Sequence, residues 1–287
     1  LQSSTLTLTG AGDVTIQGSA TAVSGGTLKA ESYSGDLAIS AAGNSATVNN
    51  TVLNLDTTGN ISITGSMPVA GGLLTVTNAA DVTITGSVGN LLPDGSVITD
   101  TGSISIESES NMVVNGLTVN NAEKVTLTGD TTGPVAMSVT LNNCESWDII
   151  NKSQTSAAPW VVGLTVDGTT YGNCYGVTVT DDDNGTASAS LPVASAGTNI
   201  TLSATPDRGY RFKEWQVTPD TVTINDNQFT MPGANVTVQA VFESIPSVDV
   251  AIDEANFPDK TFREYVSDNF DENEDNVLSD DEIAKVT

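Results

Sequence analysis

The sequence predicts a mostly β protein: a parallel β-solenoid (β-helix), followed by a small antiparallel β domain and a short helical segment around an acidic loop. Residues 1–174 repeat a pattern of short apolar runs about every 22 residues, which is typical of stacked coils. Residues 175–245 contain alternating runs bounded by Gly, Pro and Asn, which indicate antiparallel strands. Residues 246–287 join one stretch of helical periodicity to a run of carboxylates.

The repeat in residues 1–174 predicts the solenoid. Its clearest copies are LTLTGAGDVTIQG (Leu6–Gly18), LTVTNAADVTITG (Leu74–Gly86) and LTVNNAEKVTLTG (Leu117–Gly129), and further copies begin at Leu28, at Leu53, near Val97 and at Val139. Within each run, apolar residues alternate with Thr or Ser, which is the spacing of a strand. We therefore expect two or three strands per coil, with Leu, Val and Ile inside and Thr outside.

Polar residues recur between the runs and predict the turns of each coil. Gly, Asn and Asp tolerate tight turns and positive φ. Asn78, Asn121 and Asn143 follow the first run of their copies, so we expect their side chains to hydrogen-bond from coil to coil. The acids that precede a strand are interpreted as ordinary turn residues; they include Asp13, Asp36 and Asp81.

Four aromatic residues cluster near the end of the repeat: Trp147, Trp160, Tyr171 and Tyr175. We expect them to cap the open end of the solenoid core, and the alternative is that they stack on a sugar ring. The two cysteines, Cys144 and Cys174, can form a disulfide or serve as small buried apolar residues, and the second interpretation is preferred.

The charge of the chain excludes several classes of partner. Lys and Arg number 9 and Asp and Glu number 35, so the net charge is −26. Binding to phosphates needs clustered Lys or Arg, so we expect no nucleic acid and no anionic membrane surface as partner. No apolar run approaches the roughly 20 residues that span a bilayer, so we expect no membrane insertion. Such an acidic, self-repelling chain is expected to be a soluble monomer.

The solenoid carries few groups that could perform catalysis. Pectin-degrading enzymes share this architecture and need an Arg or Lys base or clustered carboxylates. Residues 1–174 contain no Arg or His, and their bases are Lys29, Lys124 and Lys152. We therefore expect no enzyme. A carbohydrate-active enzyme is the alternative, and a carboxylate pair with an adjacent Lys on one solenoid face would support it.

The middle of the chain predicts a β domain whose core holds Tyr210, Phe212, Trp215, Phe229 and Phe242. Asp183-Asn184-Gly185 predicts a hairpin turn between two strands, and the acids before it are interpreted as a solvated turn. The strings GTNITLSATPDRGYRFKEWQV and FTMPGANVTVQAVFE resemble the divergent internalin-type B-repeat, over about Tyr175–Glu243. This resemblance implies a non-enzymatic extracellular spacer or binding module.

The acidic tail predicts a helix and a calcium loop, after a linker at residues 244–247. The helix is expected to begin at about Asp259, and its apolar face holds Phe262, Tyr265, Val266 and Phe270. The next twelve residues, DENEDNVLSDDE, follow the spacing of an EF-hand loop. Its six ligand positions are Asp271, Asn273, Asp275, the Val277 carbonyl, Ser279 and Glu282. We expect weak Ca²⁺ binding, in the ~10⁻⁴–10⁻³ M range of extracellular modules.

Two features leave alternatives to the calcium site open. Position 6 of the loop is Asn276 where Gly is usual, although Asn is the next best residue at positive φ. Ser279-Asp280-Asp281-Glu282 can also act as a capping box that starts a helix without metal. A degenerate loop that has lost Ca²⁺ binding is the second alternative.

The tail IDEANFPDKTFREYVSDNFDENEDNVLSDDEIAKVT resembles the EF-hand-like segment found in front of leucine-rich repeats in surface proteins of gut Firmicutes. Dockerins are the rival family, but they carry two loops and usually Asp at position 12, whereas this tail has one loop ending in Glu282. Because the chain starts with Leu and stops soon after the loop, we expect a fragment of a larger protein.

Together these features predict a modular, extracellular protein of a Gram-positive gut bacterium, either displayed on the cell surface or secreted. Its expected function is adhesion or display, through binding of a host glycan or protein, with Ca²⁺ as a structural clip. A passive stalk for a leucine-rich-repeat domain is the alternative. A uniform solenoid with no groove and no exposed aromatic residue would favour the stalk.

Overall fold

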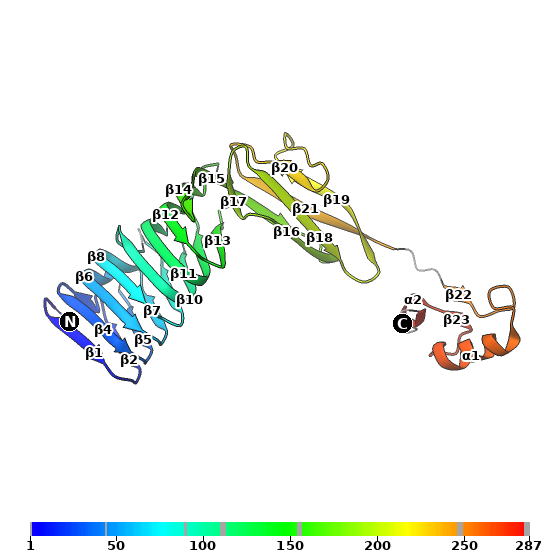
Figure 1. Cartoon of the computed structure of the whole chain (residues 1–287), viewed down its shortest axis with the longest axis horizontal. Coiled ribbons are helices and arrows are strands. Elements are labelled where there is room, and N and C mark those ends of the chain that lie inside the picture. The colour runs from blue at the N-terminus through cyan, green and yellow to red at the C-terminus, as the bar shows by residue number, and fades with distance from the viewer. Residues whose placement is uncertain are drawn as a thin grey trace. The chain divides into compact units, whose positions relative to one another are not determined.

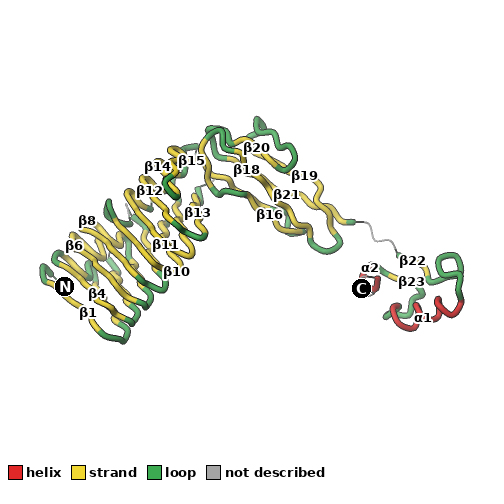
Figure 2. Tube along the Cα trace, viewed as in Figure 1, coloured by secondary structure: helices red, strands yellow, loops and turns green. Residues whose placement is uncertain are grey.

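The computed structural model describes residues 2–43, 45–88, 91–109, 113–153, 157–245 and 249–283. Strands dominate the described chain, and both of its helices lie in the C-terminal segment (Figure 2). Two compact units are present: residues 1–180 with 188–203 and 217–238, and residues 181–187 with 204–216 and 239–287. The predicted mostly β fold with a parallel solenoid is confirmed. No helix in the described ranges has the length and apolar character that crossing a membrane requires.

The solenoid winds through about seven turns around three parallel faces (Figure 1). Strands that run around a corner take part in more than one face: β6 (Ala46–Thr57), β8 (Met67–Thr77), β10 (Ser96–Ser108), β11 (Val114–Gly129), β12 (Ala136–Asn142) and β14 (Val161–Val166). Face 1 joins these six to β1 (Thr5–Thr9) and β4 (Thr27–Tyr33). Face 2 runs through β2 (Val14–Gly18), β5 (Leu37–Ala41), β7 (Ile61–Thr64), β9 (Val82–Gly86), β10, β11 and β13 (Ser146–Asn151). Face 3 holds β3 (Val23–Ser24) with β6 and β8, and later β11, β12 and β14.

The register between coils follows the predicted repeat. The first residues of the copies stack in one column of face 1: Leu6, Leu28, Leu53, Leu74, Leu117 and Val139. The column is buried from Leu28 onward, as are the stacked Ile39, Ile63, Ile84 and Ile106 of face 2. Parallel pairing places the same residue type above itself in successive coils, so aliphatic columns form a continuous core.

The predicted copy near Val97 is displaced by one residue. Val97 pairs with Thr75 on the outer surface, so Ser96 occupies the inward position beside Leu117. A buried hydroxyl needs a hydrogen-bond partner, and the Ser96 Oγ donates to the Pro93 carbonyl at 2.7 Å. The polar inward residue is therefore satisfied within its own turn.

Residues at positive φ turn the chain at two corners of the coil. Between faces 3 and 1 these include Gly26, Asn50, Gly72, Gly95, Gly116, Ser138 and Gly163, and between faces 1 and 2 they include Gly10, Ser32, Asn78, Asp100, Asn121 and Asn143. This backbone conformation costs most L-residues about 1–2 kcal/mol and costs Gly, Asn and Asp less. At Gly72 a Cβ would also lie 2.0 Å from the Thr51 carbonyl oxygen, so this corner requires glycine.

The predicted asparagine stack is confirmed at the corner between faces 1 and 2. Asn78 Nδ2 donates to Asp56 Oδ1 at 2.8 Å, one coil away. Asn121 Nδ2 donates to Asp100 Oδ1 at 2.7 Å and Asn143 Nδ2 donates to Asn121 Oδ1 at 3.0 Å. These bonds run between neighbouring coils, so they fix the register at the corner where the chain bends. We call this column the asparagine ladder.

The acids that precede strands serve a similar structural purpose, as predicted. Asp13 Oδ1 accepts from the Asp36 backbone N–H at 3.1 Å, and Asp36 Oδ1 accepts from the Asn60 N–H at 2.7 Å. In the same way Asp81 Oδ1 accepts from the Ser103 N–H at 2.7 Å. Each carboxylate satisfies a turn amide of the next coil.

The β domain follows in two sheets. The first contains β15 (Thr169–Thr180), β17 (Val193–Ser195), β19 (Tyr210–Thr218) and β21 (Val236–Ser244), and the second contains β16 (Gly185–Ala189), β18 (Asn199–Pro206) and β20 (Gln228–Thr230). β15 pairs antiparallel with β14 and with β17, so one strand belongs to the solenoid and to the β domain. The predicted domain limits, 1–174, 175–245 and 246–287, stay a prediction, and β15 runs through the first of them.

The hairpin predicted at Asp183-Asn184-Gly185 is wrong. β15 and β16 belong to different sheets, so this turn passes from one sheet to the other. Asp182 Oδ2 accepts from the Phe242 N–H at 2.9 Å, which holds the turn by a bond to a distant strand. A Cβ on Gly185 would lie 2.6 Å from the Thr205 carbonyl oxygen. The acids are thus turn residues, as expected, and Gly185 is required by close packing.

The predicted aromatic core of the β domain is only partly buried. Phe229 and Phe242 are 2% and 5% exposed. Tyr210, Phe212 and Trp215 are half-buried. The Phe212 ring lies 5.0 Å from the Trp215 ring and 6.1 Å from the Phe242 ring. The remaining buried residues of the domain are mainly aliphatic: Val193, Ile200, Leu202, Val236 and Val238.

The tail consists of β22 (Val250–Ala251), α1 (Lys260–Phe270), β23 (Val277–Leu278) and α2 (Asp280–Ile283). Asp259 caps α1, because its side chain accepts from the Phe262 N–H at 2.7 Å. Of the predicted apolar face, Val266 is buried with Ile252 and Leu278, whereas Phe262 and Tyr265 are 54% and 53% exposed. Within the predicted linker, residues 246 and 247 lie outside the described residues.

Replacing Asn121 tests the asparagine ladder. Asn121→Ala removes one donor and one acceptor bond and places Ala at φ 54, so we expect a loss of about 2 kcal/mol of unfolding free energy. Thr118→Ala, on the outer surface of the same strand, should cost less than about 0.5 kcal/mol. Urea unfolding followed by circular dichroism measures both. Equal losses for the two variants would show that the ladder does not stabilise the coils.

Candidate functional site

The acidic loop predicted to bind Ca²⁺ lies between α1 and α2. α1 ends at Phe270, so Asp271 is the first residue of the loop. β23, inside the loop, pairs antiparallel with β22, with Val250 opposite Leu278. The Ile252 N–H donates to the Asn276 carbonyl at 2.8 Å. The short strand inside the loop, β23, is therefore paired with β22 of the same segment.

Side chains in the first half of the loop fold back on their own backbone. Asp271 Oδ1 accepts from the Asp275 N–H at 3.1 Å, and its Oδ2 accepts from the Asn276 N–H at 2.9 Å. Asn273 Oδ1 also accepts from the Asp275 N–H, at 3.1 Å. Asp275 Oδ1 accepts from the Val277 N–H at 2.8 Å. The first three predicted ligand side chains thus lie around one turn of backbone.

Glu282 closes the second half of the loop. Its Oε2 accepts from the Ser279 N–H at 2.9 Å and from the Ser279 Oγ at 2.7 Å, and its Oε1 accepts from the Glu272 N–H at 2.8 Å. The hydrogen bonds from Ser279 and Glu272 lower the pKa of the Glu282 carboxyl, because they stabilise its charged form. Glu282 and Asp271 are only 5% and 6% exposed.

The loop accommodates its departure from the EF-hand pattern. Asn276 has φ 62, and Glu274 has φ 58. Asn276 therefore adopts the backbone conformation for which Gly is usual at position 6, at the lower cost that Asn pays. The sharp turn predicted at position 6 therefore forms here without glycine.

The donor set suits a hard cation, and its carboxylates already accept hydrogen bonds from the loop backbone. Among the described residues, no three of His, Cys, Asp and Glu converge as a metal site would require. Asp271, Asn273 and Asp275 gather in the first half of the loop, and Glu282 bonds both to Ser279 and to the Glu272 N–H beside Asp271. The six calcium ligands named above stay a prediction. A hollow of about 440 Å³ opens beside them, lined by Ser267, Asp268, Asp271, Glu274 and Asn276.

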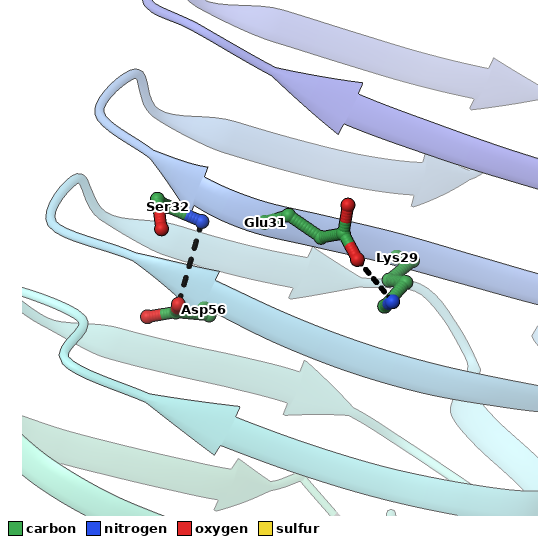
Figure 3. A network of polar contacts seen from close by, with 4 residues as sticks. All are labelled: Lys29, Glu31, Ser32 and Asp56. Atoms are coloured by element: carbon green, nitrogen blue, oxygen red, sulfur yellow. Dashed lines mark hydrogen bonds and ion pairs between the residues drawn. The ribbon is translucent and has the colours of Figure 1, made fainter.

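A second polar cluster lies on face 1 of the solenoid (Figure 3). The Lys29 ammonium forms an ion pair with Glu31, and Asp56 accepts from the Ser32 N–H at 3.3 Å. Asp56 also accepts from Asn78 in the asparagine ladder. A carboxylate pair with an adjacent Lys is the arrangement that would support the carbohydrate-active alternative. Both carboxylates, however, already have partners that hold neighbouring residues of the solenoid in place.

The end of the solenoid carries the predicted aromatic cap. Trp160 is 7% exposed and belongs to the core, and Trp147 and Tyr171 are half-buried against it. A Cβ on Gly176 would lie 2.4 Å from the Trp160 ring, so only glycine lets β15 pass over the indole. Tyr175 lies on β15, opposite Ala194 of β17. The capping interpretation is confirmed for Trp147, Trp160 and Tyr171.

Sequence reasoning missed a hollow of about 430 Å³ at this end. Its lining consists of Trp147, Asp148, Ile150, Trp160, Val177, Thr178, Val179, Ala189, Leu191 and Pro192. A signal was present: outward positions of face 2 hold Thr126 and Thr128 in one copy, and the paired positions of the next hold Asp148 and Ile150. Burial raises the pKa of the Asp148 carboxyl, against the opposing effects of the Ile149 N–H and the charge of Lys124.

The two cysteines are free thiols, as preferred from the sequence. Cys174 is buried in the core, and burial raises the pKa of its thiol to about 11. Burial also raises the pKa of the Cys144 thiol, which packs against the same core. Both residues serve as small apolar side chains.

In calcium-free solution, the stability of the loop is expected to depend on pH through the Glu282 carboxyl. Its folded pKa is lowered, so its ionised form stabilises the loop above about pH 4.3, the ordinary value for Glu, and the stabilisation is lost as pH falls through the lowered value. An NMR titration should show the Ser279 and Glu272 amide shifts moving with the Glu282 carboxyl. Glu282→Gln should abolish this shared transition. Titration of Glu282 at or above the ordinary value would contradict the observed hydrogen bonds.

Comparisons with known proteins identify one part of the chain. Neither the curated proteins nor the solved structures contain a significant match. Residues 175–246 match the family model described as the divergent InlB B-repeat domain. This match confirms the resemblance stated for Tyr175–Glu243, and the family is typical of bacterial surface proteins. The chain therefore joins a β-solenoid to a segment, residues 175–246, that is similar to the divergent InlB B-repeat domain.

Proposed function

We propose that the chain is the adhesive part of an extracellular bacterial surface protein, which binds a host glycan or protein and performs no catalysis. The observation that carries the proposal is the divergent InlB B-repeat domain at residues 175–246. In the same proposal the source is a Gram-positive gut bacterium, and the tail is the EF-hand-like segment found in front of leucine-rich repeats.

The solenoid supports adhesion better than a passive stalk. Its coils are not uniform to the end, because a hollow lined by Trp147, Asp148 and Ile150 opens beside β13. Its outer surface also presents rows of polar side chains at one-coil spacing, such as Thr118, Thr140 and Thr165. A rigid surface with a groove and a half-exposed aromatic residue is what a binding module needs and a spacer does not.

The acidic tail is proposed to be stiffened by Ca²⁺. Residues 244–287 hold 13 of the 35 acids and 3 of the 9 bases, so this part of the chain repels itself. A cation among Asp271, Asp275 and Glu282 would offset that repulsion, in competition with the backbone N–H groups that these carboxylates accept from. The ion would thus act as a clip within the segment.

A carbohydrate-active enzyme is the second candidate, because Lys29, Glu31 and Asp56 lie together on face 1. It is less favoured because Lys29 already pairs with Glu31, and Asp56 belongs to the asparagine ladder. Such an enzyme needs one carboxyl free to give a proton to the leaving group.

Binding of the chain to an array of host glycans, mucins and matrix proteins tests adhesion directly. We expect specific binding that survives at physiological salt, because an adhesin of this charge cannot rely on phosphate contacts. The same polysaccharides are then incubated with the chain and examined for released sugars. No binding to any array member would favour the stalk, and measurable turnover that Glu31→Gln abolishes would establish the enzyme instead.

Calorimetric titration with Ca²⁺ tests the loop. We expect a Kd in the range of ~10⁻⁴–10⁻³ M. Asp271→Asn and Glu282→Gln should each weaken binding about tenfold or more, because each removes a charged ligand, which corresponds to ~1.4 kcal/mol. The matched control is Glu264→Gln, an exposed acid on α1 that pairs with Lys260 at 3.6 Å. If the control weakens binding as much as the loop variants, the acids act through bulk charge and not as ligands.

A further inference from the structure

The three faces of the solenoid end differently at the B-repeat. Faces 1 and 3 both end at β14, which is covered by antiparallel pairing with β15, from Val166 opposite Thr169 to Val161 opposite Cys174. Face 2 ends at β13 (Figure 1). Among the described residues β13 has one strand partner, β11, in the register Lys124–Ser146 to Gly129–Asn151. One face of the solenoid therefore ends in an open edge.

An open edge of this kind presents backbone groups to which another strand can hydrogen-bond. Alternate N–H and C=O groups of a parallel strand point to each side, so the outer groups of β13 have no strand partner in the part of the chain that the structure describes. Proteins usually block such edges with charged side chains, especially Lys, with Pro or with a bulge. β13 reads Ser-Trp-Asp-Ile-Ile-Asn and has no Pro, no Lys and continuous pairing with β11, and its one charged residue, Asp148, lines the hollow.

The hollow described above lies directly at this edge. Trp147, Asp148 and Ile150 of β13 form one part of its wall, and Val177 and Val179 of β15 form another. Its volume of about 430 Å³ falls within the range of ligand pockets, roughly 300–1,000 Å³. Most of the lining is apolar, and Asp148 is its one charged residue.

We propose that β13 is a docking edge for an extended peptide segment of a partner protein, which adds a strand along Ser146–Asn151. One apolar side chain of the peptide enters the hollow, and a Lys or Arg of the peptide pairs with Asp148. Main-chain hydrogen bonds supply affinity in this mode of recognition, and the pocket supplies specificity. The inference deepens the proposed adhesion function and rests on it in taking the partner to be a protein.

The chemistry of the site favours a peptide over a sugar. Trp160 is 7% exposed and is covered by Gly176, so it cannot offer its ring face to a sugar. The polar side chains of the lining are Asp148 and Thr178, too few to pair the hydroxyl groups of a hexose. An extended peptide, in contrast, uses the backbone groups that β13 leaves open at every second residue.

Charge supports a basic peptide. The nearby Lys152 is already paired with Glu107, and the net charge of the chain is −26. Lys124 lies close enough to influence Asp148, but burial has the larger effect on that carboxyl. A cationic side chain in the hollow would find an incompletely neutralised carboxylate in partly apolar surroundings, where charge pairing is strong.

The test is selection of random peptides displayed on phage, using the full chain as bait and Asp148→Lys as counter-selection. We expect enriched peptides that alternate apolar residues around one Lys or Arg. A synthetic enriched peptide should bind at least tenfold more weakly to Asp148→Lys and to Ile150→Lys. The matched control, Thr118→Lys, lies on the face 1 part of β11 and outside the hollow, and should bind the peptide as the native chain does. Circular dichroism confirms that each variant folds.

Backbone methylation separates strand addition from simple filling of the hollow. N-methyl groups on one set of alternate peptide residues should weaken binding at least tenfold, and those on the other set should leave it unchanged. Hydrogen exchange at residues 146–151 should slow when the peptide is bound. Equal binding by both methylated peptides, or slowed exchange elsewhere, would overturn the proposal.

The remaining outcomes distinguish the inference from the adhesion function. An array ligand that binds Asp148→Lys as well as the native chain, with no peptide enriched, would overturn the docking edge and leave adhesion standing. A glycan whose binding Asp148→Lys abolishes would place the adhesive site here and overturn the peptide. A dimer of the chain that Asp148→Lys dissociates would show that a second copy occupies the edge, again overturning the proposal. If neither an array member nor any peptide binds the chain, both the adhesion function and the docking edge are overturned.

Discussion

The structure depends on parallel backbone pairing that returns each coil to the same register, although Leu28 and Leu53 lie 25 residues apart and Leu53 and Leu74 lie 21 apart. Because each coil returns to the same register, the aliphatic residues of one coil stack on those of the next, as Leu28, Leu53 and Leu74 do. A single coil is too thin to bury its own apolar side chains, and it contacts only its neighbours, so stacking between coils forms the core. An insertion inside a strand would move every following side chain to the opposite surface. Polar corner residues are therefore as important as the apolar columns.

A corner residue must both adopt a particular backbone conformation and hydrogen-bond to the next coil. A positive φ lets the chain turn between faces within one residue, and the side chain of that residue then bonds to the next coil. Asn121 does both, since it has φ 54 and bonds to Asp100 and Asn143. Asn is suited to this because it tolerates the left-handed region and has both a donor and an acceptor. Gly satisfies only the first requirement, and it predominates at the other corner, where Thr51 leaves no room for a Cβ at Gly72.

A stacked core must also be closed at its end, and the manner of closure decides what the end can bind. Trp160 closes the core, and Gly176 lets β15 cross above it. β15 then covers the strand that ends faces 1 and 3, but it does not pair with β13. The hollow is thus a consequence of joining a three-sided solenoid to a domain that continues only one strand. In the tail, hydrogen bonds to backbone amides allow Asp271 and Glu282 to be buried as carboxylates.

The sequence by itself determined the features that repeat or are local. The period, the inward Leu and Ile columns, the asparagine ladder, the start of α1 near Asp259 and the similarity to the B-repeat all follow from patterns within one coil or one segment. Tertiary structure decided what depends on residues far apart in the chain. Ser96 and not Val97 lies inward because of pairing with neighbouring coils, and Gly185 joins two sheets because the Asp181–Asn184 turn is held by Phe242. The open edge at β13 and the backbone amides bound by Asp271 and Glu282 also arise only from packing, since sequence spacing fixes which residues can meet but not which groups they finally bond.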